Sequence, residues 1–345
     1  MIKKSEVVSS WNQYLKSFEL ASQDIYFTEN YVRLYEDNEQ QAVCYVYQEN
    51  ENILLLPFLR SVFTWNGEIL YDFETPYGYG GPIVNTDDQG FVGRALNALM
   101  EYGKKYGYLA GFIRFHPVLH NSDLCKNVFH IILDRHTVAM DLSMDIDEVW
   151  MQEVHTKNRN VIKKAEKNGL TFVADYNYEY LDHFIALYNG TMDKLGATSF
   201  YYFADSYYKK LVKNIPDSFL GVVKQGDEVL SAAIFMYSGP YGHYHLSGSN
   251  KSKLALSPNN YMLWEAAKEL KKQGVERFHL GGGINSDESN SLLLFKMKYS
   301  KSLYDFCLGK LIFNQEKYDV ICAEWGERNP EKAEQYKSFL LKYKY

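Results

Sequence analysis

The fold of this chain is decided by YGHYHLSGSN (241–250), SPNNYMLWEAAKELKKQG (257–274), ERFHLGGGI (276–284) and LLLFKMKYS (292–300). These stretches predict a strand, a loop and helix, a second strand that ends in a glycine turn, and a Phe-Lys pair. A helix that begins beside a strand edge offers free N–H groups and the positive end of its dipole to an anion. Acyl-transfer folds hold their donor in such a place, so the segment suggests a transferase.

The same order of elements occurs earlier in the chain. AVCYVYQENENILLLPFLR (42–60) and FLGVVKQGDEVLSAAIFMY (219–237) each predict a hairpin, with turns at Gln48–Asn52 and Gln225–Glu228. Each hairpin follows a helical stretch, 9–20 or 178–196, and precedes a helix closed by glycine, at Gly107 or Gly274. We interpret this as a tandem duplication of an α+β unit, with mostly antiparallel sheets flanked by helices.

The duplication predicts two domains, 1–140 and 141–345, and we expect the C-terminal helix, 330–345, to pack back on the first domain. A chain of 345 residues has enough length for two cores. The net charge of −6 argues against DNA as a partner, since broad nucleic-acid binding needs a basic surface. The 30 tyrosines can each combine an apolar ring with a polar contact.

The compartment is expected to be the cytoplasm. Four scattered cysteines form no CxxC pair, which argues against both a disulfide framework and a structural zinc site. The sequence contains no apolar run approaching the ~20 residues of a transmembrane helix, and its first residues lack the apolar core of a signal peptide.

A basic segment, HTKNRNVIKKAEKNG (155–169), lies between the duplicated regions. Arg159 and Lys163 are candidates for binding the phosphates of a substrate, because arginine offers paired donors and lysine a point charge. The alternative is a solvated helix face.

Together with PYGYGGPIVN (76–85), HYHLSGSN (243–250) and the stretches above, this segment makes the chain resemble the FemABX-type peptidyltransferases and their GNAT-like relatives. The resemblance implies two tandem GNAT-like domains, similar to acyl-CoA N-acyltransferases. It also implies transfer of an amino acid from aminoacyl-tRNA to an amine of a peptidoglycan precursor. The long helical hairpin that binds tRNA in some members is absent from this sequence, so the chain looks more like the compact members.

The resemblance places the reaction centre at Phe295 and Lys296, which we expect on a strand. A lysine ammonium there can stabilise the negative charge that develops on the carbonyl oxygen when an amine attacks an acyl ester. Lys298 would share that strand face and remains the alternative. In PYGYGGP, Tyr79, or Tyr77 instead, matches the tyrosine that helps to bind the precursor.

Three further residues are candidates for substrate binding: Tyr244, Asn260 and Tyr261. Where family members can carry an acidic residue, this chain has Asn85, so a carboxylate or phosphate of the substrate is expected to accept the proton of the amine. No serine or cysteine nucleophile motif is present, and direct attack by the amine is therefore the simplest mechanism.

Two alternatives remain. Acetyl-CoA or another acyl-CoA is a possible donor, although SGSNKSKLALSPNN (247–260) lacks the glycine spacing of a pyrophosphate turn. Ser257 and Pro258 predict a capped helix start there, and Lys251 and Lys253 could still hold phosphates. A non-catalytic binding protein on the same scaffold is the second alternative. No tightly bound cofactor or metal is expected, because His243 and His245 on one strand lack a carboxylate at ligand spacing.

Overall fold

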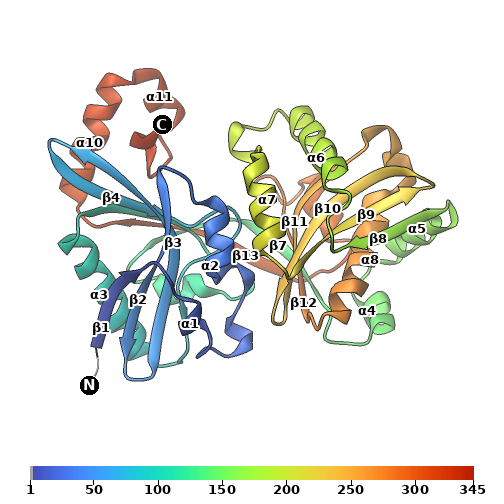
Figure 1. Ribbon diagram of the computed structural model, residues 1–345, viewed down its shortest axis with the longest axis horizontal. Helices are drawn as coiled ribbons and strands as arrows, with labels where there is room; N and C mark the ends of the chain where they lie inside the picture. The colour runs from blue at the N-terminus through green and yellow to red at the C-terminus, as the bar shows by residue number, and fades with distance from the viewer. Residues whose placement is uncertain (1–2) are drawn as a thin grey trace. The chain divides into compact units, whose positions relative to one another are not determined.

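The computed structural model describes residues 3–345, and their contacts divide the chain into two compact units (Figure 1). Unit 1 contains the residues up to Asp134 together with Asp305–Tyr345, and unit 2 contains Arg135–Tyr304. The bounds 1–140 and 141–345 refer to duplicated sequence and remain a prediction, whereas these units are defined by contacts. Each unit has a mixed sheet flanked by helices, which confirms the predicted α+β class.

Unit 1 has a sheet with the strand order β1-β2-β3-β4-β6-β13, and the short β5 pairs with β3. Neighbouring strands are antiparallel except β4 and β6, which are parallel and joined by α3. The strands are β1 (Lys3–Val8), β2 (Gln40–Glu49), β3 (Asn52–Trp65), β4 (Glu68–Glu74), β5 (Ile83–Val84), β6 (Tyr108–Arg114) and β13 (Leu303–Ile312). The helices are α1 (Asn12–Leu15), α2 (Glu29–Val32), α3 (Gln89–Lys105), α10 (Gln315–Arg328) and α11 (Pro330–Gln335), with short 3₁₀ turns η1 (Leu20–Ser22), η2 (Ile25–Phe27), η3 (Arg33–Tyr35), η4 (Asn121–Cys125) and η7 (Lys342–Lys344).

Unit 2 repeats this plan with the order β8-β9-β10-β11-β12-β7, in which β11 and β12 are the parallel pair, joined by α8. The strands are β7 (His130–Asp141), β8 (Leu170–Asp175), β9 (Ser218–Gln225), β10 (Glu228–Ser238), β11 (Tyr241–Ser249) and β12 (Arg277–Gly282). The helices are α4 (Ile146–Gln152), α5 (Thr156–Lys167), α6 (Leu181–Leu195), α7 (Asp205–Asn214), α8 (Pro258–Lys272) and α9 (Ser291–Lys296), with 3₁₀ turns η5 (Ser199–Tyr201) and η6 (Lys251–Leu256).

The sixth strand of each sheet comes from the other repeat of the sequence. β7 follows β6 in the chain but pairs antiparallel with β12, through Arg277↔Asp141 to Gly282↔Thr137. β13 follows β12 but pairs antiparallel with β6, through Leu308↔Arg114 to Ile312↔Ala110. If the duplication is correct, the two copies have exchanged their last strands.

The cores follow from the amphipathic pattern of the two crossover helices. In unit 2, α8 buries an apolar side that includes Met262 and Leu270, and packs with strand residues such as Phe235 and Phe278. In unit 1, α3 buries Phe91 and a row of aliphatic side chains against the sheet. Both helices end as predicted, at glycines with positive φ: Gly107 at 74° and Gly274 at 84°.

Two predicted elements differ from the structure. The helix expected at 9–20 contains only α1, because Ser17 Oγ donates a hydrogen bond of 2.7 Å to Tyr14 O and so competes with the helical pattern. The segment that contains Phe295 is helix α9 and not a strand. Asn290 starts it, since its Oδ1 accepts from the N–H groups of Leu292 at 3.0 Å and Leu293 at 3.3 Å.

Candidate active site

The parallel strands of unit 2 separate near their C-terminal ends. β11 pairs with β12 only over Tyr241–His243, opposite Arg277–His279, although β11 continues to Ser249. A bulge shifts the β10–β11 register at His245, so that Phe235 pairs with Tyr244 and Ile234 with Leu246. Bulges change the direction of nearby side chains, and the C-terminal ends of parallel strands are where open sheets bind ligands. We call this opening between β11 and β12 the open seam.

Helix α8 begins after β11 and leads to β12. Pro258 occupies its first turn, as predicted. Ser257 is not the predicted side-chain cap: it has φ 60° and its hydroxyl makes no capping hydrogen bond. The helix start is instead tied to β11 by Ser249 Oγ, which donates 2.8 Å to Asn259 Oδ1. The amides of the first turn therefore receive no hydrogen bond to the side-chain oxygen of Ser257.

Lys296 lies at the last position of α9, with only 7% of its surface exposed. Its Nζ donates a hydrogen bond of 2.7 Å to the carbonyl oxygen of Gly282, the last residue of β12. The same atom lies 6.0 Å from the centroid of the Tyr244 ring. The lysine therefore joins the end of β12 to the side chain that β11 presents at the open seam.

The buried position lowers the pKa of Lys296 from 10.5 to about 7, first through loss of water and then through repulsion by Arg135. Among residues 3–345, the structure records no carboxylate paired with this ammonium. A lysine with such a pKa changes its protonation state near neutral pH, which is the property that proton transfer requires.

Phe295 and Lys298 have different surroundings from Lys296. The Phe295 ring packs on the core of unit 2, with its centroid 5.8 Å from that of Tyr299. The side chain of Lys298 is exposed, and its carbonyl oxygen accepts a hydrogen bond of 2.9 Å from His155 N. Since α9 is a helix, Lys298 does not share a strand face with Lys296, which favours Lys296 as the reactive lysine.

The three other candidates in unit 2 have mainly structural contacts. Asn260 Nδ2 donates 2.7 Å to Asn158 Oδ1, and Asn260 O accepts 2.7 Å from Tyr299 Oη. Tyr261 is buried in the core, and burial raises its pKa to about 12. Tyr244 stacks on Phe235 with centroids 5.6 Å apart. Of the three, Tyr244 is the one whose ring faces Lys296 Nζ, at 6.0 Å from the ring centroid.

The basic helix α5 uses its arginine to fix the preceding helix. Arg159 Nη1 donates to three carbonyl oxygens at the end of α4, those of Trp150 at 3.1 Å, Met151 at 2.9 Å and Val154 at 3.0 Å. This satisfies carbonyl groups that a helix C-terminus leaves without partners. Lys163 is exposed, with Nζ 5.9 Å from the Trp150 ring centroid. The contacts of Arg159 explain its presence without a phosphate.

The PYGYGGP loop of unit 1 is held tightly. Tyr31 Oη donates 2.6 Å to Tyr77 O, and the Tyr79 ring lies 5.3 Å from Tyr26 and 5.3 Å from Phe306, measured between centroids. Gly81 has φ 96°, and a Cβ there would lie 2.8 Å from Asn121 Nδ2. The glycines are therefore needed for packing, whatever the tyrosines bind.

Asn85 has a structural role in the same unit. Its Oδ1 accepts 2.7 Å from Ile53 N, and its Nδ2 donates 2.8 Å to Glu51 O. An acid at this position could not make the second bond when ionised. The residue is thus matched to the β2–β3 turn.

Two polar side chains were not selected as site candidates from the sequence, the buried His116 and the half-buried Arg135. In unit 1, His116 Nε2 lies 3.1 Å from Asp24 Oδ2, while His116 Nδ1 accepts 3.2 Å from Leu119 N. The neutral ring therefore carries its proton on Nε2, facing Asp24. The Tyr79 ring lies 5.9 Å from that of His116. Since these residues are far apart in the sequence, no local motif could predict that they lie together. Arg135, in unit 2, is the other group and is considered below.

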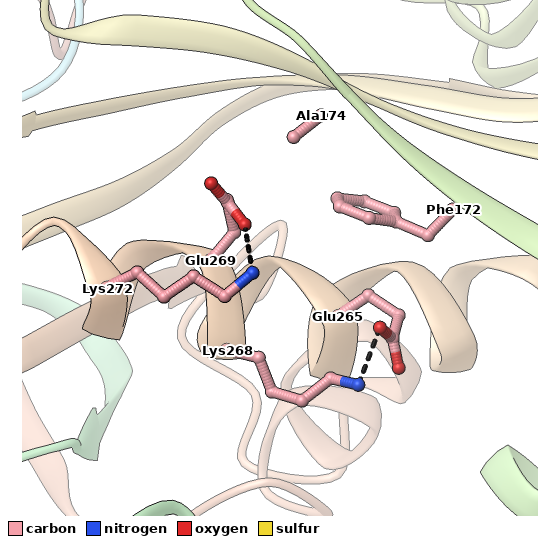
Figure 2. A pocket seen from close by; sticks show the side chains of 6 residues that line it. All are labelled: Phe172, Ala174, Glu265, Lys268, Glu269 and Lys272. Carbon is pink, nitrogen blue, oxygen red and sulfur yellow. Dashed lines mark hydrogen bonds and ion pairs between the residues drawn. The ribbon is translucent and has the colours of Figure 1, made fainter.

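A pocket of about 330 Å³ lies between β8 and α8 (Figure 2). Two ion pairs on α8 flank it, Glu265–Lys268 at 2.6 Å and Glu269–Lys272 at 2.8 Å. None of the predicted site residues is among those that line it: Phe172, Ala174, Glu265, Lys268, Glu269 and Lys272. The open seam with Lys296 is therefore the stronger candidate for the reaction centre.

Comparison with known proteins agrees with this geometry. The family profile described as an acetyltransferase (GNAT) domain matches residues 153–288, which lie within unit 2. The crystal structure of FemX superposes with a TM-score of 0.71 and 16% identity over 92% of this chain and 99% of that chain. The chain has a FemABX-type GNAT fold. No curated protein sequence matches it.

Two further structures share the fold. L-PGS from Bacillus licheniformis gives a TM-score of 0.55 at 13% identity, over 90% of this chain and 94% of that chain. The C-terminal domain of a putative lysylphosphatidylglycerol synthetase from Agrobacterium fabrum gives 0.54 at 14% identity, over 88% and 93%. With the GNAT domain, these likenesses support an acyltransferase. Within residues 3–345, no helix combines the length and apolar character that crossing a membrane requires.

Proposed function

We propose that this protein is an aminoacyltransferase that forms an amide on an amine of a cell-envelope precursor of the peptidoglycan type. The observation that carries the proposal is the buried Lys296, whose Nζ binds Gly282 O at 2.7 Å beside the open seam. An acyl carbonyl placed there can replace Gly282 O as the acceptor. Lys296 then stabilises the oxyanion that forms as the amine attacks, an effect worth about 3–4 kcal/mol for a well-placed donor.

Direct attack by the amine is favoured over a covalent enzyme intermediate. Burial raises the pKa of all four cysteine thiols, which disfavours the thiolate that a nucleophile needs: Cys44, Cys125, Cys307 and Cys322. The new bond therefore joins the substrate amine to the acyl carbon, and the ester oxygen of the donor leaves.

Aminoacyl-tRNA is our proposed donor. The fold is shared with FemX and with a putative lysylphosphatidylglycerol synthetase, a protein named for a lysyl group. The loop before α8 lacks the glycine turn that holds the pyrophosphate of acetyl-CoA. The proposed partners are aminoacyl-tRNA and a peptidoglycan precursor or another small molecule with an amine, and we place the reaction in the cytoplasm.

An acyl-CoA-dependent N-acetyltransferase is the second candidate. It is favoured by the description of the matched domain as a GNAT acetyltransferase. It is also compatible with the start of α8, where the Ser257 side chain supplies no capping oxygen. Against it, Lys253 is paired with Glu228 at 2.8 Å, which offsets its charge for a phosphate.

The test compares donors directly. The purified protein is incubated with a UDP-linked muropeptide and either aminoacyl-tRNA or acetyl-CoA, and amide products are measured by mass spectrometry. We expect an aminoacylated muropeptide only with aminoacyl-tRNA. An acetylated product would instead establish the second candidate. Binding seen by thermal shift with no product from either donor would show a non-catalytic protein on this scaffold.

A further inference from the structure

Arg135 lies in β7, beside the glycine turn at the end of β12. Its Nη1 donates a hydrogen bond of 3.0 Å to Gly283 O, and Lys296 Nζ donates 2.7 Å to Gly282 O. Two cationic side chains thus bind consecutive carbonyl groups of one turn. β7 itself pairs with this end of β12, through Gly281↔Val138 and Gly282↔Thr137, so Arg135 is carried by a fixed element.

The glycine turn packs closely against β7 and the start of α9. A Cβ on Gly282 would lie 2.6 Å from His136 O and 3.3 Å from Arg135 Cδ. A Cβ on Gly283 would lie 2.8 Å from Asn290 Oδ1, the oxygen that caps α9. Gly282 and Gly283 are therefore explained by close packing among β7, β12 and the start of α9, which fixes Arg135 relative to Lys296.

Arg135 remains positively charged over the whole pH range in which Lys296 titrates. A guanidinium keeps its proton throughout the pH range of proteins, whereas a buried lysine can lose its own. After burial, repulsion by Arg135 is the second cause that lowers the pKa of Lys296 to about 7. The loop that follows β12 also contains Asp287 and Glu288, and Glu288 Oε1 lies 3.9 Å from His136 Nε2 with the Glu288 side chain 83% exposed.

We propose that Arg135 is a positioning residue that holds the glycine turn against Lys296 and prepares Lys296 to carry a proton from the attacking amine to the leaving oxygen. This inference rests on the proposed function. It explains why a fixed positive charge lies beside a lysine that is itself expected to be charged.

The proposed step balances without a further reactant. The amine nitrogen bonds to the acyl carbon and the acyl C–O bond of the donor breaks, with its electron pair going to the leaving oxygen. The Lys296 ammonium gives a proton to that oxygen and then takes one from the nitrogen. The products are an amide and an alcohol, and Lys296 returns to its initial state.

The first test needs no substrate. Lysines are labelled competitively with acetic anhydride across a pH series and quantified by mass spectrometry, with the exposed Lys301 as internal reference. We expect half-maximal labelling of Lys296 near pH 7 in the wild type. In Arg135→Gln we expect the midpoint to rise by at least about one pH unit, and in Arg135→Lys to stay near the wild-type value.

The matched control is Arg277→Gln, since Arg277 lies on β12, the strand that ends in the glycine turn, but is paired with Asp141 of β7 at 2.5 Å. It should leave the Lys296 midpoint unchanged. An unchanged midpoint in Arg135→Gln overturns the inference. If that variant does not fold, a wild-type midpoint near that of an ordinary lysine overturns it equally.

The second test is the pH dependence of kcat with the donor that proves active. Because the ammonium form is needed, wild-type kcat should fall as pH rises through about 7. In Arg135→Gln the fall should move to higher pH while the plateau drops about tenfold, and Arg135→Lys should restore both. If the plateau of kcat is lower in Arg135→Gln but kcat still falls at the wild-type pH, Arg135 only supports the turn. Failure of the proposed function would appear instead as no product from the wild type, with the labelling result intact.

Discussion

The two units share one topology, but their parallel strands differ in whether they stay paired at their C-terminal ends. In unit 1, β4 pairs with β6 from Tyr71↔Tyr108 to Glu74↔Phe112, the full C-terminal end of β4, and Phe73 lies over Gly111. In unit 2, the pairing of β11 with β12 ends after three residues. The closed seam of unit 1 is filled by its own side chains, whereas the open seam of unit 2 adjoins Lys296.

The starts of the crossover helices differ in the same sense. Helix α3 of unit 1 is capped by Asp88, whose carboxylate accepts 2.8 Å from Gly90 N. Helix α8 of unit 2 has no side-chain capping oxygen from Ser257. A carboxylate at a helix start repels an anionic donor, since it occupies the positive end of the dipole. The start of α8 is therefore the better match to the donor site that we propose, and unit 2 is also the unit that matches the acetyltransferase family.

The largest expected effect is loss of catalysis in Lys296→Met. Removal of the Lys296 ammonium from the open seam should lower kcat/KM by about 10²–10³-fold. Lys301→Met, which changes a nearby exposed lysine, should retain wild-type rates. Steady-state kinetics on both variants measures this contrast. If unit 2 is not the catalytic unit, the two variants will behave alike.

The same variant should be at least as stable as the wild type at low pH. Because the folded pKa of Lys296 is about 7 and the unfolded value 10.5, wild-type stability rises with pH between these values. Methionine removes the cost of the buried charge. The gain in Tm over the wild type should thus be largest at pH 6 and shrink towards pH 10.

The next largest effect is expected for Gly111→Ala, which adds a Cβ at the closed seam of unit 1. A Cβ there would lie 2.1 Å from Phe73 Cζ, so we expect a loss of about 3 kcal/mol in the free energy of unfolding. Gly93→Ala is the matched control, because Gly93 is helical with nothing within 4 Å of its Cβ position, and it should be neutral or slightly stabilising. Equal stability of both variants in urea denaturation would show that this seam can open.

Asp72→Asn tests the closed seam through pH. Asp72 lies in β4, and burial raises its pKa from 3.8 to about 7, while Tyr343 Oη donates 2.8 Å to its Oδ1 and Lys344 and Glu74 lie nearby. The wild type therefore loses stability as pH rises from about 4 to about 7. We expect the variant to be more stable by about 2 kcal/mol at pH 8, below the ceiling of about 4 kcal/mol set by the pKa change. Thermal melts should show no advantage at pH 4; an advantage that does not vary with pH would contradict this assignment.

The smallest effect compares the two helix starts. Asp88→Ala should cost about 1 kcal/mol because it removes a cap, whereas Ser257→Ala should change the free energy of unfolding by less than about 0.5 kcal/mol. Chemical denaturation at matched pH measures both. A larger loss in Ser257→Ala would mean that its hydroxyl caps α8 in solution and that the two units differ less than the structure indicates.

Much of the fold could be predicted from the sequence because it depends on local patterns. Alternating apolar residues around the turns at Gln48–Asn52 and Gln225–Glu228 specify the hairpins, and the glycines at 107 and 274 specify the helix ends. The exchange of β7 and β13 could not be predicted, because the residues of a strand do not specify which other strand it pairs with. The helix of Phe295 and Lys296 was missed although Asn290 is a typical cap.

The candidate site divides in a similar way. Lys296 was identified through family resemblance, and its burial is consistent with a special role, although its catalytic role stays a prediction. Arg159 was proposed to bind phosphates because its charge can be read from the sequence. The carbonyl groups that it binds in the structure cannot be read from the sequence. Arg135 and Gly283 are 148 positions apart, so no local sequence pattern could predict the hydrogen bond between them.

The exchanged strands also affect the order in which the protein can be built. The sheet of unit 1 contains β13, which is synthesised after the whole of unit 2. On the ribosome, unit 1 must therefore wait with the open edge of β6 unpaired while about 170 residues are added, a time of about 10–30 s at ordinary rates of translation. Unit 2 has its own sixth strand, β7, from the start and can complete its sheet first. The unit that emerges first is thus the last to finish folding.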